Sequence, residues 1–195
     1  MNLPFELFSS SLLTFGVIFL AEMGDKSQLV CMTLASRHRA RPVAIGAVAA
    51  FSLLNLLAVT VGTSLTHFIP QQWLTLIAAG LFAVFGIQAL LCQEDEEEGI
   101  NEGSQKTGRN IFLTTLMMIF LAELGDKTQL AVITMGTTYS PLSVWLSATL
   151  ALSATSLIGV YAGRKFLSRI NIQSLHRING MFFITLAALL LIDQL

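Results

Sequence analysis

Charged side chains are scarce in this chain of 195 residues: Asp, Glu, Lys and Arg make up only 12% of it. A soluble domain carries about twice that share. Apolar residues make up 54%, and the mean hydropathy is +0.71. So few polar side chains cannot cover a water-facing globule, and we expect a lipid bilayer as the solvent. The net charge of −1 gives no electrostatic basis for nucleic-acid binding.

Cysteine and histidine are also rare. Cys31 and Cys92 lie inside apolar runs, which predicts buried free thiols rather than a disulfide framework. His38, His67 and His176 lie near the ends of apolar runs and are expected to be solvated. The sequence therefore offers no cluster of the soft ligands that zinc or copper prefers.

Six apolar runs are each long enough to cross a bilayer, which takes about 20 mostly apolar residues. The predicted spans are 7–34, 43–65, 73–91, 110–135, 142–163 and 175–192. Pro42 and Pro141 stand at the starts of the second and fifth runs, where proline suits the first helical turn. The predicted fold class is an all-α integral membrane protein with six transmembrane helices.

Basic residues fall almost entirely in alternate connections between these runs. Nine of the eleven Lys and Arg residues lie in connections one, three and five: Arg37, Arg39, Arg41, Lys106, Arg109, Arg164, Lys165, Arg169 and Arg177. The positive-inside rule then places loops 1, 3 and 5 in the cytoplasm and both termini outside. The two remaining cations, Lys26 and Lys127, lie inside predicted spans.

The third connection divides the chain. It contains five consecutive acidic residues, 94–98, followed by Gly, Asn and Ser, a composition typical of a solvated, flexible linker. We therefore predict a first three-helix repeat over 1–92, an acidic cytoplasmic linker over 93–109 and a second three-helix repeat over 110–195.

The first and fourth runs carry two copies of one motif. Residues 18–29 read Ile-Phe-Leu-Ala-Glu-Met-Gly-Asp-Lys-Ser-Gln-Leu, and residues 119–130 repeat ten of those twelve positions. Chance similarity between apolar helices would reproduce Leu and Ala, but not Glu-x-Gly-Asp-Lys-Ser/Thr-Gln in register. Because each half has three spans, the second copy must enter the membrane from the opposite side. This is the inverted-repeat plan of many secondary transporters, whose sites lie near the midplane.

Each motif places ionisable groups deep in a predicted span, where a charge costs at least a few kcal/mol. Glu22 and Asp25 are three residues apart and are expected to share a helix face. Gly24 and Gly125 permit close helix approach or a local unwinding that frees carbonyl oxygens. The candidate metal ligands are Glu22, Asp25, Gln28, Glu123, Asp126 and Gln129, and the supporting candidates are Lys26, Ser27, Lys127, Thr128, Asn55 and Ser156.

The charge of the two motifs together suggests the cargo. Four carboxylates and two ammonium groups leave a charge of −2, which one divalent cation or two protons would neutralise in a low dielectric. Carboxylate, amide and hydroxyl oxygens favour calcium, manganese or magnesium over zinc or copper.

A purely structural interpretation of the charged residues in the two motifs is an alternative. Glu22–Lys26 and Glu123–Lys127 could be internal ion pairs that only hold the bundle together, although two lysines do not balance four carboxylates. Asn55 and Ser156 stand at equivalent places in the second and fifth runs, and interhelical hydrogen bonding is their simpler role.

With both motifs intact, the whole chain resembles the cation/proton exchanger family of the Golgi, chloroplasts and bacteria, marked by two copies of Glu-x-Gly-Asp-Lys-Ser/Thr around an acidic loop. The resemblance implies calcium- or manganese-for-proton exchange, with bacterial members that look like manganese exporters. It places the family's acidic positions on Glu22, Asp25, Glu123 and Asp126. The short length, with no targeting extension, fits a member in the bacterial inner membrane.

We therefore expect a transporter that exports Mn²⁺, or else Ca²⁺, in exchange for protons by alternating access, not an enzyme, and without a cofactor. An exporter of a small organic solute such as an amino acid is an alternative that the sequence leaves open. An intramembrane aspartyl protease is a remote one, because Glu22 and Glu123 stand where its Gly-x-Gly-Asp motif needs glycine. The expected partners are the metal ion, protons and lipid, and a homo-oligomer is compatible with the sequence.

Overall fold

The computed structural model describes residues 3–91 and 108–167, together with 177, 180, 181, 184, 185, 187–189, 191 and 192. All secondary structure in these residues is helical, as predicted. The helices are α1 (Leu3–Glu22), α2 (Lys26–Arg37), α3 (Ala40–Leu65), α4 (Gln71–Leu91), α5 (Gly108–Glu123), α6 (Lys127–Thr138) and α7 (Pro141–Leu167). Most of the linker, and much of the sixth predicted span, lies outside the described residues.

The first and fourth predicted spans are not single helices, and the prediction is wrong on this point. Each is divided by a three-residue interruption, which we call the first break (residues 23–25) and the second break (residues 124–126). Gly24 and Gly125 both have φ of 85°, a left-handed conformation that glycine adopts easily and that commonly ends a helix. In each copy the amide of the following aspartate donates to the carbonyl of the glutamate, at 3.2 Å.

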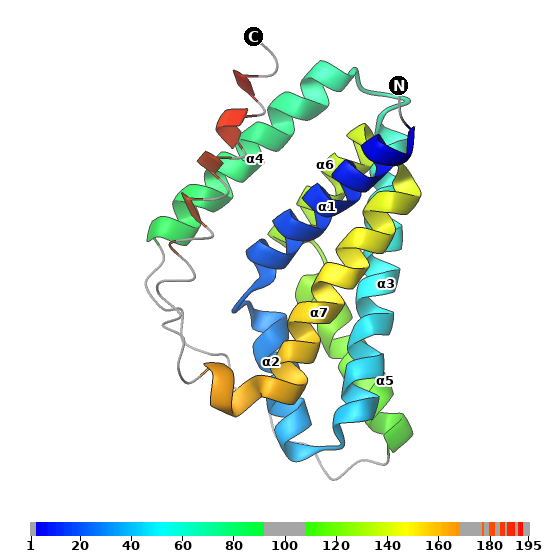
Figure 1. The fold of residues 1–195 in the computed structure, drawn as a ribbon, viewed down its shortest axis with the longest axis vertical. Helices are drawn as coiled ribbons and strands as arrows, with labels where there is room; N and C mark the ends of the chain where they lie inside the picture. The colour runs from blue at the N-terminus through cyan, green and yellow to red at the C-terminus, as the bar shows by residue number, and fades with distance from the viewer. Residues whose placement is uncertain are drawn as a thin grey trace.

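The two divided helices run in opposite directions. In Figure 1, α1 and α2 lead from the N-terminal end of the bundle to the end where α3 begins, whereas α5 and α6 lead back. The packing is reciprocal: α3 contacts α5 and α6, α7 contacts α1 and α2, and α3 and α7 contact each other. Each divided helix therefore packs against the long helix of the other half.

The long helices α3 and α7 form the centre of the bundle because small residues let their neighbours approach. At Gly46 of α3, a Cβ would lie 2.7 Å from the Phe112 carbonyl oxygen of α5. Phe51 of α3 is fully buried in the core, and Pro42 and Pro141 lie in the first turns of α3 and α7, as predicted. Helix α4 lies apart from α1 at the side of the bundle (Figure 1).

Much of the outward surface is apolar, while several polar side chains are inside. Leu57 of α3, Leu121 of α5 and Leu150 of α7 are exposed, whereas Thr115 and Thr155 are buried. Such a pattern suits lipid rather than water outside. Within the described residues, two stretches are long and apolar enough to cross a membrane, Ala40–Leu65 and Pro141–Tyr161.

The close approach at Gly46 gives a stability prediction. In Gly46→Ala, the new methyl group would meet the Phe112 carbonyl oxygen and, at 3.0 Å, the Thr115 Cβ. Such overpacking lowers the free energy of unfolding by about 1–3 kcal/mol. Thermal unfolding in detergent measures the change. Gly16→Ala in α1, where no other atom lies within 4 Å of the added Cβ, is the matched control. Equal midpoints for the two variants would contradict the packing described for α3.

Candidate metal centre

The two breaks bring carboxylates from both motifs together. One carboxylate oxygen each from Glu22, Glu123 and Asp126 lies within 4.8 Å of the others. Glu22 has no exposed surface and Glu123 is 7% exposed, while Asp126 is half-buried. The glutamates end α1 and α5, and Asp126 stands just before α6. The cluster therefore depends on the breaks, which turn the chain at the point where its acidic residues lie.

Asp25 has a different neighbour from the other three acidic groups. Its carboxylate forms an ion pair with the Lys127 ammonium group at 2.7 Å, and the two side chains are 11% and 22% exposed. The pair joins the first break to α6, across the two motifs. The pairing expected under the structural interpretation, Glu123 with Lys127, is not the pair observed. The Lys26 side chain lies outside the described part of the chain.

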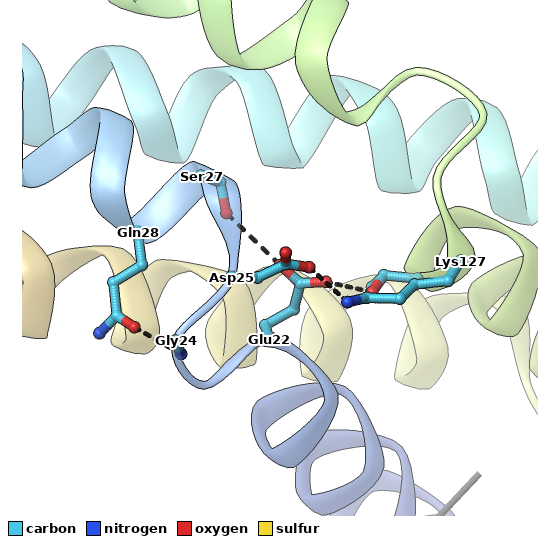
Figure 2. Close-up of polar contacts among 7 residues, drawn as sticks. Glu22, Gly24, Asp25, Ser27, Gln28 and Lys127 are labelled. Carbon is cyan, nitrogen blue, oxygen red and sulfur yellow. Dashed lines mark hydrogen bonds and ion pairs between the residues drawn. The ribbon is translucent and has the colours of Figure 1, made fainter. Parts of the chain in front are cut away.

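Glu22 and Asp25 do not share a helix face, so that expectation is wrong. Glu22 is the last residue of α1, and Asp25 lies beyond Gly24 in the break. Figure 2 shows both side chains on the same side of the break even so, with Lys127 reaching toward them from the other motif. The break in the helix therefore brings the Glu22 and Asp25 side chains to the same side, which regular helical spacing was expected to do.

Hydroxyl groups from both motifs donate to Glu22. The Thr128 hydroxyl donates to one carboxylate oxygen, and the Ser27 hydroxyl lies 3.4 Å from the other. Ser27 and Thr128 are 1% and 2% exposed. These two supporting residues therefore lie beside Glu22 and orient its oxygens.

The two glutamines bind the backbone of the breaks. The Gln28 amide oxygen accepts from the Gly24 amide at 2.7 Å, and Gln129 accepts from Gly125 in the same way. In Figure 2 the Gln28 side chain turns away from the Glu22 and Asp25 carboxylates. We therefore leave both glutamines out of the ligand set proposed below.

Asn55 and Ser156, the supporting candidates outside the two motifs, lie in the central helices α3 and α7. The Asn55 amide of α3 donates to the Thr149 hydroxyl of α7 at 3.1 Å, the interhelical role named as the simpler one. Ser156 of α7 is 1% exposed. A partner that the sequence did not indicate is the Thr155 carbonyl oxygen, which accepts from Gln28 at 3.0 Å. A backbone acceptor leaves no signal in residue type, so no motif could have revealed it.

The three clustered carboxylates fit a divalent ion with hard oxygen ligands. Calcium takes oxygens at about 2.3–2.6 Å, so two of its ligands can lie roughly 5 Å apart at most. The oxygens of Glu22, Glu123 and Asp126 already lie within that limit. Buried like charges at this spacing repel one another, and a cation or protons between them would relieve the repulsion.

Comparison with known proteins decides the family. The family model described as divalent cation/proton antiporter GDT1 matches residues 10–97 and 111–195, nearly the whole chain. The chain belongs to this family. Its members are transporters rather than enzymes, and the transport of divalent cations across a membrane is therefore the functional class of the chain.

Relatives in bacteria and plants agree with this assignment. GDT1-like protein sll0615 of Synechocystis is 28% identical over 184 residues, which cover 86% of this chain and 89% of that protein. GDT1-like protein 3 of Arabidopsis thaliana is 25% identical, covering 92% and 69%. The chloroplastic PAM71-homolog of the same plant is 24% identical over 89% of this chain and 56% of its own length. No solved structure matches the chain.

Proposed function

We propose that this chain exports Mn²⁺, with Ca²⁺ as the second candidate, from the cytoplasm in exchange for protons. The ion would bind to Glu22, Glu123 and Asp126, near the middle of the membrane. The observation that carries the proposal is the meeting of carboxylates from two oppositely directed motifs in one buried cluster. Asp25 and Lys127 would hold the two motifs in this arrangement through their ion pair.

The proposed architecture is six spans in two inverted three-helix repeats, separated by the linker. Its support is the opposite direction of the divided helices and the reciprocal packing of α3 and α7. Broken helices that meet at a pseudo-twofold axis are typical of transporters that bind ions at the midplane. Rocking of one half against the other would then expose the site to each side in turn.

The direction of transport follows from the proposed topology. Arg37, Arg39 and Arg41 surround the α2–α3 connection, and Figure 1 places the start of α5, with Arg109, at the same end of the bundle. The positive-inside rule puts that end in the cytoplasm and the N-terminus outside. In bacteria this corresponds to the inner membrane, where inward proton flow would drive metal outward.

Exchange with protons has a simple electrostatic basis. If the three clustered carboxylates, two of them buried, lost a bound cation, their charge would be uncompensated in a low dielectric, and protons can neutralise it. A site that is occupied either by one divalent ion or by protons therefore couples the two flows. Nothing in the described residues favours the organic-solute exporter or the protease over this function.

Transport into liposomes tests the proposal. With purified protein in vesicles and a proton gradient imposed, we expect Mn²⁺ to move against the direction of proton flow, and the gradient to collapse faster when metal is present. Fluorescent indicators for metal and for pH measure the two flows. Movement of an amino acid, or no movement of Mn²⁺ or Ca²⁺, would overturn the proposal.

A further inference from the structure

Both breaks share one local hydrogen bond. The glutamine four residues after the glycine accepts from the glycine amide, in Gly24–Gln28 and again in Gly125–Gln129. This bond pairs a backbone N–H group within the break, where the helical hydrogen-bond pattern is interrupted. To this point the two motifs are alike, as their sequences are.

Only the first glutamine has a described hydrogen bond to another helix. The Gln28 side-chain nitrogen donates to the Thr155 carbonyl oxygen of α7 at 3.0 Å. Gln28 is 2% exposed and Thr155 is 1% exposed, so water does not compete for this bond. Through one side chain, the Gly24 amide of the first break is connected to the backbone of α7.

A glycine makes the close approach possible. At Gly159, one turn after Thr155, a Cβ would lie 2.8 Å from the Gln28 carbonyl oxygen and 2.9 Å from its Cγ. The repeat offset of 101 puts Ala58 at the equivalent place in α3. Helix α3, which packs against α5 and α6, therefore carries a methyl group at the place where α7, which packs against α1 and α2, has none.

Helix α3 approaches α6 closely at another glycine. A Cβ at Gly62 of α3 would meet the carbonyl oxygen of Ile133 in α6. Ile133 lies four residues, about one helical turn, beyond Gln129. Gly62 of α3 thus approaches α6 beyond Gln129, whereas Gly159 of α7 approaches α2 at Gln28 itself.

The two breaks differ in exposure accordingly. Gly24 of the first break is buried, with Met23 half-buried. In the second break Gly125 is exposed and Leu124 is 54% exposed. The break that is tied to its neighbouring helix is the less exposed one.

We propose that Gln28 is a positioning residue that fixes the first break to α7, so that the opening movement of transport takes place at the second break. The inference rests on the proposed transport function. It assigns the two nearly identical motifs different tasks: the first keeps Glu22 and Asp25 in place, and the second carries Glu123 and Asp126 toward and away from them.

Gln28→Glu tests this assignment. Glutamate keeps an oxygen for the Gly24 amide but has no side-chain nitrogen to donate to the Thr155 carbonyl. We expect the maximal rate of Mn²⁺ transport in liposomes to fall roughly tenfold or more, as happens when residues that hold metal ligands in place are changed. The metal concentration at half-maximal rate should change less than about threefold, because the three clustered carboxylates are untouched.

A labelling experiment separates positioning from general damage. Met23→Cys and Leu124→Cys each place a thiol in one break. The rate at which each thiol reacts with a water-soluble maleimide in lipid nanodiscs measures the accessibility of that break. Labelling at the native cysteines is subtracted. Without further change we expect rapid labelling at position 124 and slow labelling at position 23. Adding Gln28→Glu should make position 23 react at least about fivefold faster, because local opening exposes it. Gln129→Glu, which introduces the same group in the other motif, should leave position 23 slow.

Gly159→Ala is a second route to the same result. Its methyl group should push α7 away from Gln28 and raise labelling at position 23, whereas Gly80→Ala, with nothing within 4 Å of the added Cβ, should not. The inference is overturned if Gln28→Glu transports at the normal rate or leaves position 23 protected. If protein without these changes moves no metal, the proposed function fails. The labelling pattern still tests whether the Gln28 hydrogen bond holds the first break against α7.

Discussion

Glu22→Gln is expected to abolish metal transport. Glu22 has no exposed surface, and the Thr128 and Ser27 hydroxyls donate to its oxygens. The amide keeps the size of the side chain but removes its charge and one acceptor oxygen. Changes to residues around metal ligands cost about 10–100-fold, so loss of a direct ligand should reduce the Mn²⁺ transport rate roughly a hundredfold or more. Uptake into liposomes under a proton gradient measures the loss.

The control for this variant is Glu98→Gln in the acidic linker. It removes the same charge from a segment expected to be solvated, where single charges contribute little. We therefore expect its transport rate to stay within about twofold of that of the unmodified protein. Equal rates for Glu22→Gln and Glu98→Gln would remove Glu22 from the site.

Lys127→Met should strongly destabilise the protein. The Lys127 ammonium group compensates the Asp25 carboxylate at 2.7 Å, and Asp25 is only 11% exposed. Removing one partner of a buried ion pair leaves an uncompensated charge and costs about 3–5 kcal/mol. Thermal or denaturant unfolding in detergent, followed by fluorescence, measures the change.

The double variant Lys127→Met with Asp25→Asn tests the reason for that loss. Because it removes both charges, it should recover most of the lost stability even though it restores no contact. If the double variant is as unstable as Lys127→Met alone, packing of the lysine side chain rather than charge compensation accounts for the loss. A Lys127→Met protein as stable as the original would contradict the ion pair itself.

The sequence identified the acidic residues that lie together, but not the backbone breaks that carry them. Glu22, Glu123 and Asp126 were recognised because ionised groups are costly within apolar runs, and the structure brings them together. The breaks were anticipated only as one option for Gly24 and Gly125. The apolar pattern continues on both sides of each glycine, so counting span length cannot reveal where φ becomes positive.

The ion pair between the two motifs could not be predicted from the sequence, for a different reason. Lys127 is one turn from Glu123 along the sequence, which favours a local pair, but the break separates them and brings Asp25 within 2.7 Å. The near-identity of the motifs likewise suggested equal roles for Gln28 and Gln129. The hydrogen bond from Gln28 to α7 lies beside Gly159, where α3 has Ala58, and the motif comparison did not include these neighbouring helices.

Locating a bound manganese ion tests the central claim most directly. Crystals of the protein grown with Mn²⁺ and measured near the manganese absorption edge would show the ion by its anomalous scattering. We predict one peak among the Glu22, Glu123 and Asp126 carboxylates, which disappears in Glu22→Gln. A peak bound elsewhere in the bundle, or one that persists without the Glu22 charge, would contradict a transport site built jointly by the two motifs.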